Sequence, residues 1–270
     1  MNILNRLLDT VKEVGSAFFD KRSGTGKAIY TMKDICLAAF SMFFIQSESF
    51  LGYQRVLEKG HGTSNCQSLF GMENIPTDNH IRSMLDEVAP SQLQSCFTAA
   101  LETLKNEGGL PALQRLDGRV LIALDGTEYF CSQKLGCPHC QERKRSNGKT
   151  EHYHSMLCAT LVAPGHNMAL PLMPEFITPQ DGHEKQDCER EAAKRWLTTH
   201  HEEVRSLRPV YLGDSLFSCQ SICQSIKEKE ADFLFNCKPG GHKAVYDFLD
   251  GAEKEQHQRQ EPKKHAISTF

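Results

Sequence analysis

The sequence contains no apolar run long enough to cross a membrane and no excess of basic charge. Its longest apolar run, ICLAAFSMFFI at 35–45, covers 11 residues, whereas a membrane-spanning helix needs about 20. The formal net charge is −3 and the pI is near 6.5, so no global basic field indicates a nucleic-acid partner. We therefore expect no membrane partner, and any nucleic-acid surface should be local.

A secretory signal and an even set of cysteines are also lacking. The first residues, MNILNRLLDTVKEVG, form an amphipathic pattern and not a charged start followed by an apolar block. The 11 cysteines are odd in number, which argues against a complete disulfide framework and favours a reduced, cytoplasmic compartment.

The sequence contains neither an internal repeat nor a low-complexity block. Its predicted secondary structure changes once, from all-helical to mixed strands and helices. Residues 1–115 carry apolar side chains at helical spacing, with Thr77 and Asp78 as expected helix caps and Pro90 at a helix entry. From 119 to 238 the pattern predicts the order β–ββ–α–β–α–β. Residues 251–270 are polar without a clear period and predict a solvated tail.

Two aspartates follow short apolar runs in matching settings. Asp125 follows VLIAL and Asp214 follows PVYLG, so we expect each to end a strand. A single such aspartate is more often a turn or cap residue. At adjacent strand ends, however, two carboxylates repel each other unless a cation lies between them, and Mg²⁺ or Mn²⁺ suits such oxygen ligands. The pair therefore predicts a metal site for phosphodiester chemistry.

Several segments resemble a family. LDGTEYF, LPLMPEFI, DGHEKQDCEREAAKRWL, YLGDSLFS and FNCKPGGHKAVYDFL together are similar to bacterial insertion-sequence transposases of the DDE type. The resemblance implies an α/β fold with a ribonuclease-H-like mixed sheet and flanking helices over 118–250, preceded by an all-helical DNA-binding region over 1–115. It also implies cleavage and transfer of insertion-element ends into target DNA, a homo-oligomer on DNA, and a bacterial cytoplasmic location at the nucleoid. Asp125 and Asp214 match the family's first two metal-binding acids.

The family's third acid, a glutamate on a later helix, has no evident match. Asp250 lies at a distance from Asp214 that would suit the third acid, but its position beside Gly251 argues against a rigid helix. We therefore expect that the chain is truncated before the family's glutamate and joins DNA strands poorly. Lys185, Asp187 and Glu189 could reach the two aspartates from the start of their helix, but we assign them to a solvated first helical turn. The alternatives left open are a catalytically inactive DNA-binding remnant of a transposase and a structural zinc-binding module.

The segment 131–154 concentrates cysteine, histidine and basic residues between the first two predicted strands. Cys137 and Cys140, with His139 between them, have zinc-knuckle spacing, and Cys131, His152 and His154 lie nearby. A lone CxxC is a weak signal, so a loop with incidental thiols is slightly favoured over a Zn²⁺ site. Five basic residues of this loop predict contacts to DNA phosphates: Lys134, Arg143, Lys144, Arg145 and Lys149.

Overall fold

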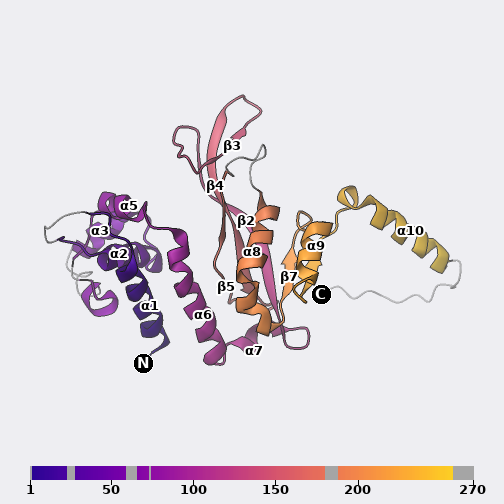
Figure 1. The fold of residues 1–270 in the computed structure, drawn as a ribbon, viewed down its shortest axis with the longest axis horizontal. Helices are drawn as coiled ribbons and strands as arrows, with labels where there is room; N and C mark the ends of the chain where they lie inside the picture. Colours follow the sequence, from indigo (N-terminus) through magenta and orange to yellow (C-terminus); the bar gives the residue numbers. More distant parts are fainter. Residues whose placement is uncertain (1, 23–27, 59–65, 73, 180–187, 258–270) are drawn as a thin grey trace. The chain divides into compact units, whose positions relative to one another are not determined.

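The protein folds as two compact units. The computed structural model describes residues 2–22, 28–58, 66–72, 74–179 and 188–257. One unit comprises Met1–Leu113 with His166–Met173, and the other comprises Gln114–Gly165 with Pro174–Phe270 (Figure 1). Among the helices in these ranges, none is long and apolar enough to cross a bilayer.

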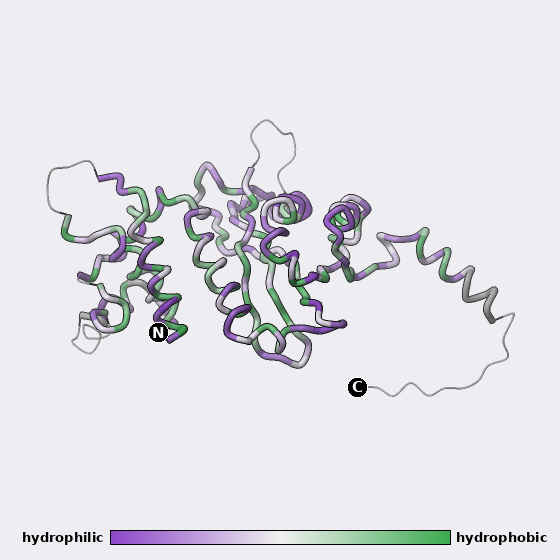
Figure 2. The backbone as a smooth tube through the Cα atoms, turned by 60° about the horizontal axis from the view of Figure 1, so that its bottom comes forward, coloured by the Kyte–Doolittle hydropathy of each residue, from purple (hydrophilic) through white to green (hydrophobic). Residues whose placement is uncertain are grey.

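The first unit is helical up to residue 113, as predicted. Its elements are α1 (Ile3–Ala17), α2 (Met32–Phe44), α3 (Phe50–Glu58), the π-helical turn η1 (Cys66–Phe70), α5 (Asp78–Leu85), the 3-10 turn η2 (Pro90–Leu93), α6 (Gln94–Asn106) and α7 (Leu110–Leu113). Polar and apolar residues alternate along their turns (Figure 2). The apolar sides of α1, α2 and α5 meet in a core that includes Leu8, Ile35 and Ile81.

Helix starts in this unit follow the local signals. Thr31 and Asp34 form a reciprocal capping box at the start of α2. The Thr77 hydroxyl accepts a hydrogen bond from the backbone N–H of His80, which confirms Thr77 as the N-cap of α5, whereas Asp78 lies in the first turn. Pro90 opens η2, which leads directly into α6.

The second unit is built on a mixed sheet. Its strands are β1 (Gln114–Arg115), β2 (Arg119–Ser132), β3 (Gln141–Lys144), β4 (Thr150–Val162), β6 (Glu175–Ile177), β7 (Val210–Gly213) and β8 (Asp232–Phe235), whereas β5 (Leu170–Pro171) belongs to the segment grouped with the first unit. The main path has the order β3-β4-β2-β7-β8. β2 is antiparallel to β4 and parallel to β7, which in turn is parallel to β8. This α/β arrangement is compatible with a ribonuclease-H-like fold, and it contains two strands, β1 and β3, that the sequence pattern did not predict.

Helices flank this sheet. The helices of this unit are α8 (Glu189–Val204), continued by the 3-10 turn η3 (Arg205–Leu207), α9 (Gln220–Lys227), the 3-10 turn η4 (Pro239–Gly241) and α10 (Lys243–His257), of which α8 and α9 pack on the sheet. α8 lies along β2 and β4 (Figure 1) and buries Ala192, Ala193 and Trp196. The Trp196 ring is fully buried and meets Tyr211 of β7 edge-on, with 6.1 Å between ring centroids. The predicted packing of Trp196 between helix and sheet is therefore confirmed.

Three sequence-based expectations about elements were wrong. Asp125 does not end its strand, because β4 continues to pair with β2 beyond it, with Asp125 opposite Cys158. The segment 131–154 is not all loop, since β3 pairs with the start of β4. The polar tail begins later than 251, because α10 includes Asp250 and continues to His257. Residues 258–270 of the expected tail lie outside the described residues.

Candidate functional site

The register of the parallel strands brings Asp125 and Asp214 to the same level of the sheet. The last aligned pair of β2 and β7 joins Ala123 to Leu212, and each aspartate lies two residues further along the chain. Side chains alternate between faces with period two, so Asp125 shares the face of Ala123. Neighbouring strands are about 4.8 Å apart. Asp125, inside β2, therefore lies level with Asp214, which directly follows the end of β7.

Asp214 uses one carboxylate oxygen to stabilise a turn and has a second oxygen that can coordinate a cation. Its Oδ1 accepts a hydrogen bond from the backbone N–H of Leu216 at 2.7 Å, which shapes the turn after β7. Asp125 and Asp214 are both exposed. A cation from solvent can therefore reach both carboxylates.

Glu189, from the first turn of α8, is the third carboxylate of this group. An ideal Cβ built on Gly126 would lie only 2.1 Å from Glu189 Cδ, so the Glu189 carboxylate lies directly against the backbone beside Asp125. Burial raises the pKa of Glu189, and the negative charges of Asp125 and Asp214 raise this pKa further. Glu189 therefore approaches β2 on the face of Gly126, and both aspartates are near enough for their charge to raise its pKa.

The assignment of Glu189 to a solvated first turn was wrong. Ala192, Ala193 and Trp196 are buried, and Glu189 precedes them by three, four and seven residues. At helical spacing, these positions share one face, so the apolar stripe of α8 carries Glu189 toward the sheet. This periodicity was the signal in the sequence. Lys185 and Asp187, grouped with Glu189 in that expectation, lie outside the described residues.

A polar pocket of about 300 Å³ adjoins Glu189. Its walls include Gly126, Thr127, Gln141, Tyr153, Ser155 and Glu189. The Ser155 hydroxyl donates a 2.6 Å hydrogen bond to Oε1 of Gln141, which ties β4 to β3 at the pocket wall. The β3–β4 hairpin and Glu189 therefore border the same pocket.

Cys137, Cys140 and His154 form a second cluster. The two sulfur atoms are 3.7 Å apart, and His154 Nε2 is 3.3 Å from Cys137 Sγ and 3.4 Å from Cys140 Sγ. His139, named as a ligand from the CxxC spacing, is exposed and is not one of the three residues whose ligand atoms converge. Instead, His154 joins the cysteines from β4, because the antiparallel pairing of β2 and β4 returns this strand beside the CxxC turn.

The histidines near this cluster have different partners. The His154 ring stacks on Tyr129, with 5.6 Å between centroids and 13° between planes. Burial lowers the pKa of His154, and the nearby His139 lowers it further. His152 Nδ1 lies 3.1 Å from Glu142 Oε1, so it belongs to a separate surface pair.

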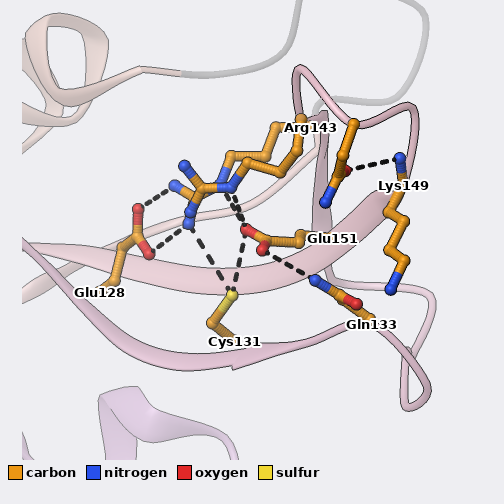
Figure 3. Close-up of polar contacts among 8 residues, drawn as sticks. Glu128, Cys131, Gln133, Arg143, Lys149 and Glu151 are labelled. Atoms are coloured by element: carbon orange, nitrogen blue, oxygen red, sulfur yellow. Dashed lines mark hydrogen bonds and ion pairs between the residues drawn. The ribbon is translucent and has the colours of Figure 1, made fainter.

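The basic residues of 134–149 divide into two groups (Figure 3). Arg143 pairs with both Glu128 and Glu151, and Arg145 Nε donates to Glu151 Oε2 at 2.7 Å. Arg145 first, and then Arg143, lower the pKa of Glu151 to about 2. The two arginines thus pair with acids of the neighbouring strands β2 and β4. The three lysines are exposed: Lys134, Lys144 and Lys149.

No family of known proteins and no curated protein matches the sequence. Among solved structures, the fold has a distant likeness to a piggyBac transposase in its synaptic complex with hairpin DNA. The TM-score is 0.36 at 10% sequence identity, and the match covers 86% of this chain and 47% of that one. The chain spans about half the length of that transposase. The functional proposal therefore rests on the geometry of this chain's own residues.

Proposed function

We propose that the protein is a metal-dependent DNA transposase of the DDE type, in which Asp125, Asp214 and Glu189 form the catalytic carboxylate cluster. The proposal rests on the register that brings Asp125 level with Asp214, on the close approach of Glu189 to Gly126, and on the effect of both aspartates on the pKa of Glu189. The ends of strands in α/β sheets are where loops hold ligand-binding groups.

The donor set fits Mg²⁺ or Mn²⁺. Carboxylate oxygens are the ligands that these hard cations prefer, and three neighbouring negative charges favour a counter-cation. Asp214 uses one oxygen for the turn at Leu216 and retains its other oxygen for coordination. Asp125 and Asp214 would hold the ion, with Glu189 beside them. When bound, the ion would polarise the scissile phosphate and promote deprotonation of the attacking water or 3′-hydroxyl.

This chain's own residues would position the DNA strand. The pocket beside Glu189 offers the hydroxyls of Thr127, Tyr153 and Ser155, which suit the sugar–phosphate backbone next to the cleaved bond. The exposed Lys134, Lys144 and Lys149 would contact more distant phosphates. The helical first unit would bind the element ends, and the chain would act as a homo-oligomer on DNA, as the resemblance implies.

Asp250, the other candidate for the third acid, lies within the helix α10 and not in an irregular segment. Glu189 already supplies a third carboxylate from an earlier position in the chain than the family's glutamate. We therefore assign the cluster to Glu189 and give Asp250 no role in it.

Strand nicking of supercoiled plasmid DNA tests the proposal. The purified chain should nick DNA with Mn²⁺ or Mg²⁺, and Asp125→Asn, Asp214→Asn or Glu189→Gln should each reduce the rate at least about 100-fold, the usual scale for loss of a group that stabilises the transition state. Glu191→Gln is the matched control, since Glu191 lies on the same helical turn but pairs with Lys194 on the surface.

The outcomes separate the open alternatives. DNA binding without nicking would identify an inactive remnant. Nicking that survives all three substitutions would place the catalytic site elsewhere. Nicking that is lost in the two aspartate variants but retained in Glu189→Gln would remove Glu189 from the cluster.

A further inference from the structure

We infer that Cys137, Cys140 and His154 bind one zinc ion that fastens the β3–β4 hairpin. The three ligand atoms come from two separate parts of the chain, the CxxC turn and the middle of β4, and all lie within 4.8 Å of one another. Two sulfurs and one imidazole are a donor set typical of zinc and foreign to Mg²⁺. The site is therefore chemically distinct from the carboxylate cluster.

The distances match a tetrahedral ion. With Zn–S near 2.3 Å and Zn–N near 2.0–2.1 Å, tetrahedral angles place two sulfurs about 3.8 Å apart and sulfur and nitrogen about 3.6 Å apart. The corresponding distances here are 3.7 Å for the sulfurs, and 3.3 and 3.4 Å from the sulfurs to His154 Nε2. One ion can therefore contact all three atoms with small movements.

The surroundings of the cluster support thiolate binding. The backbone N–H of Cys137 points to Cys140 Sγ at 3.2 Å, and the CxxC segment closes a turn through Cys140 N–H to Cys137 carbonyl at 3.0 Å. Tyr129 stacks against the His154 ring and orients its Nε2 toward the sulfurs. Because Cys137 is exposed, water could supply the fourth ligand. Zinc binding would release the two thiol protons to solvent.

The ion would act through the hairpin. Cys140 directly precedes Gln141, the first residue of β3, and Gln141 accepts the hydrogen bond from Ser155 on the pocket wall. Fixing Cys140 to His154 therefore fixes the start of β3 against β4. The zinc would hold this wall of the pocket and the lysine-bearing loop beyond it in place. This role needs no contact with a reacting phosphate.

The test is metal analysis of the full-length chain purified under reducing conditions without chelators. We expect about one zinc per chain. Replacement of zinc by cobalt should give the intense absorption of cobalt–thiolate bonds. Cys137→Ser, Cys140→Ser and His154→Gln should each weaken zinc binding more than about 10-fold, since removal of even an outer partner costs that much. Cys131→Ser and His152→Gln, which change neighbours outside the cluster, are the matched controls and should retain the zinc.

Circular dichroism of each variant checks that the fold persists. Zinc that is absent from the reduced wild-type chain, or that is retained in all three ligand variants, would overturn the inference. A Cys137–Cys140 disulfide that forms in place of zinc binding under the same reducing conditions would also overturn it. Asp125→Asn should leave the zinc content unchanged, so failure of the zinc site and failure of the carboxylate site are distinguishable.

Discussion

The Glu189 side chain occupies the space that a Cβ at position 126 would fill, with Cδ 2.1 Å from that point. The Asp-Gly pair at 125–126 is therefore not a turn signal in this chain. Asp125 supplies a carboxylate, and Gly126 makes room for the next one. This relationship joins a strand residue and a helix residue that are more than 60 positions apart in the sequence.

Gly126→Ala should impair catalysis more than folding. The new methyl group would displace the end of the Glu189 side chain, which is flexible, and not the backbone. We expect a fall in the nicking rate on the order of 10²-fold, the effect of a displacement of about 1 Å, with a small change in melting temperature. Gly148→Ala serves as a strain control, because Gly148 has a φ of +78° and nothing lies near its missing Cβ. It should lower stability without the catalytic loss.

Divalent cations should stabilise the folded chain through the carboxylate cluster. At a Mn²⁺ concentration of 100 times the dissociation constant, a single site contributes about 2.7 kcal/mol to the free energy of unfolding. Thermal melting with and without Mn²⁺ measures this effect. Asp125→Asn should abolish the Mn²⁺-dependent rise in melting temperature, whereas Glu191→Gln should retain it. An equal rise in both variants would indicate binding elsewhere.

DNA affinity should depend on the lysines of the hairpin and not on its arginines. Alanine at Lys134, Lys144 and Lys149 should weaken binding about equally for all sequences and reduce the salt slope by about one unit per lysine. Arg143→Ala should mainly reduce stability, because Arg143 pairs with Glu128 and Glu151 and lies 4.6 Å over the Tyr153 ring. Fluorescence anisotropy at several salt concentrations measures both slopes. An unchanged slope in the triple lysine variant would show that the loop is only solvated surface.

The Glu151 ion pairs should give stability a specific pH dependence. The pKa of Glu151 is lowered to about 2 by Arg145 and Arg143, below the usual value of about 4.3 in an unfolded chain. Its stabilising contribution is therefore fully present above pH ~4.3 and is lost as the pH falls toward ~2.

Urea unfolding from pH 7 to pH 3 measures this dependence. The wild-type chain should be more stable than Glu151→Gln at pH 7, and the difference should shrink below pH ~4.3. Glu142→Gln is the control on the same hairpin and should show a smaller difference. A constant gap between the wild-type chain and Glu151→Gln across this range would contradict the ion-pair assignment.

The local sequence pattern was sufficient to predict several features of the structure. Some patterns are local: the apolar spacing of 1–113, the Thr77 cap and the short apolar runs before Asp125 and Asp214. The sequence alone therefore predicted the helical region, the order of the main strands and helices along the chain, and two acids in matching settings. The packing of Trp196 followed from its apolar neighbours on α8. Each of these features depends on residues within a few positions of one another.

Only the tertiary structure decided the rest, because it depends on which strands pair. The long pairing of β2 with β4 carried the strand past Asp125 and brought His154 to the CxxC turn. The packing of α8 on the sheet placed Glu189 against Gly126. The β3–β4 pairing turned Arg143 and Arg145 toward Glu151. Local periodicity indicates which face a residue occupies, but the partner that this face meets is set by contacts distant in sequence.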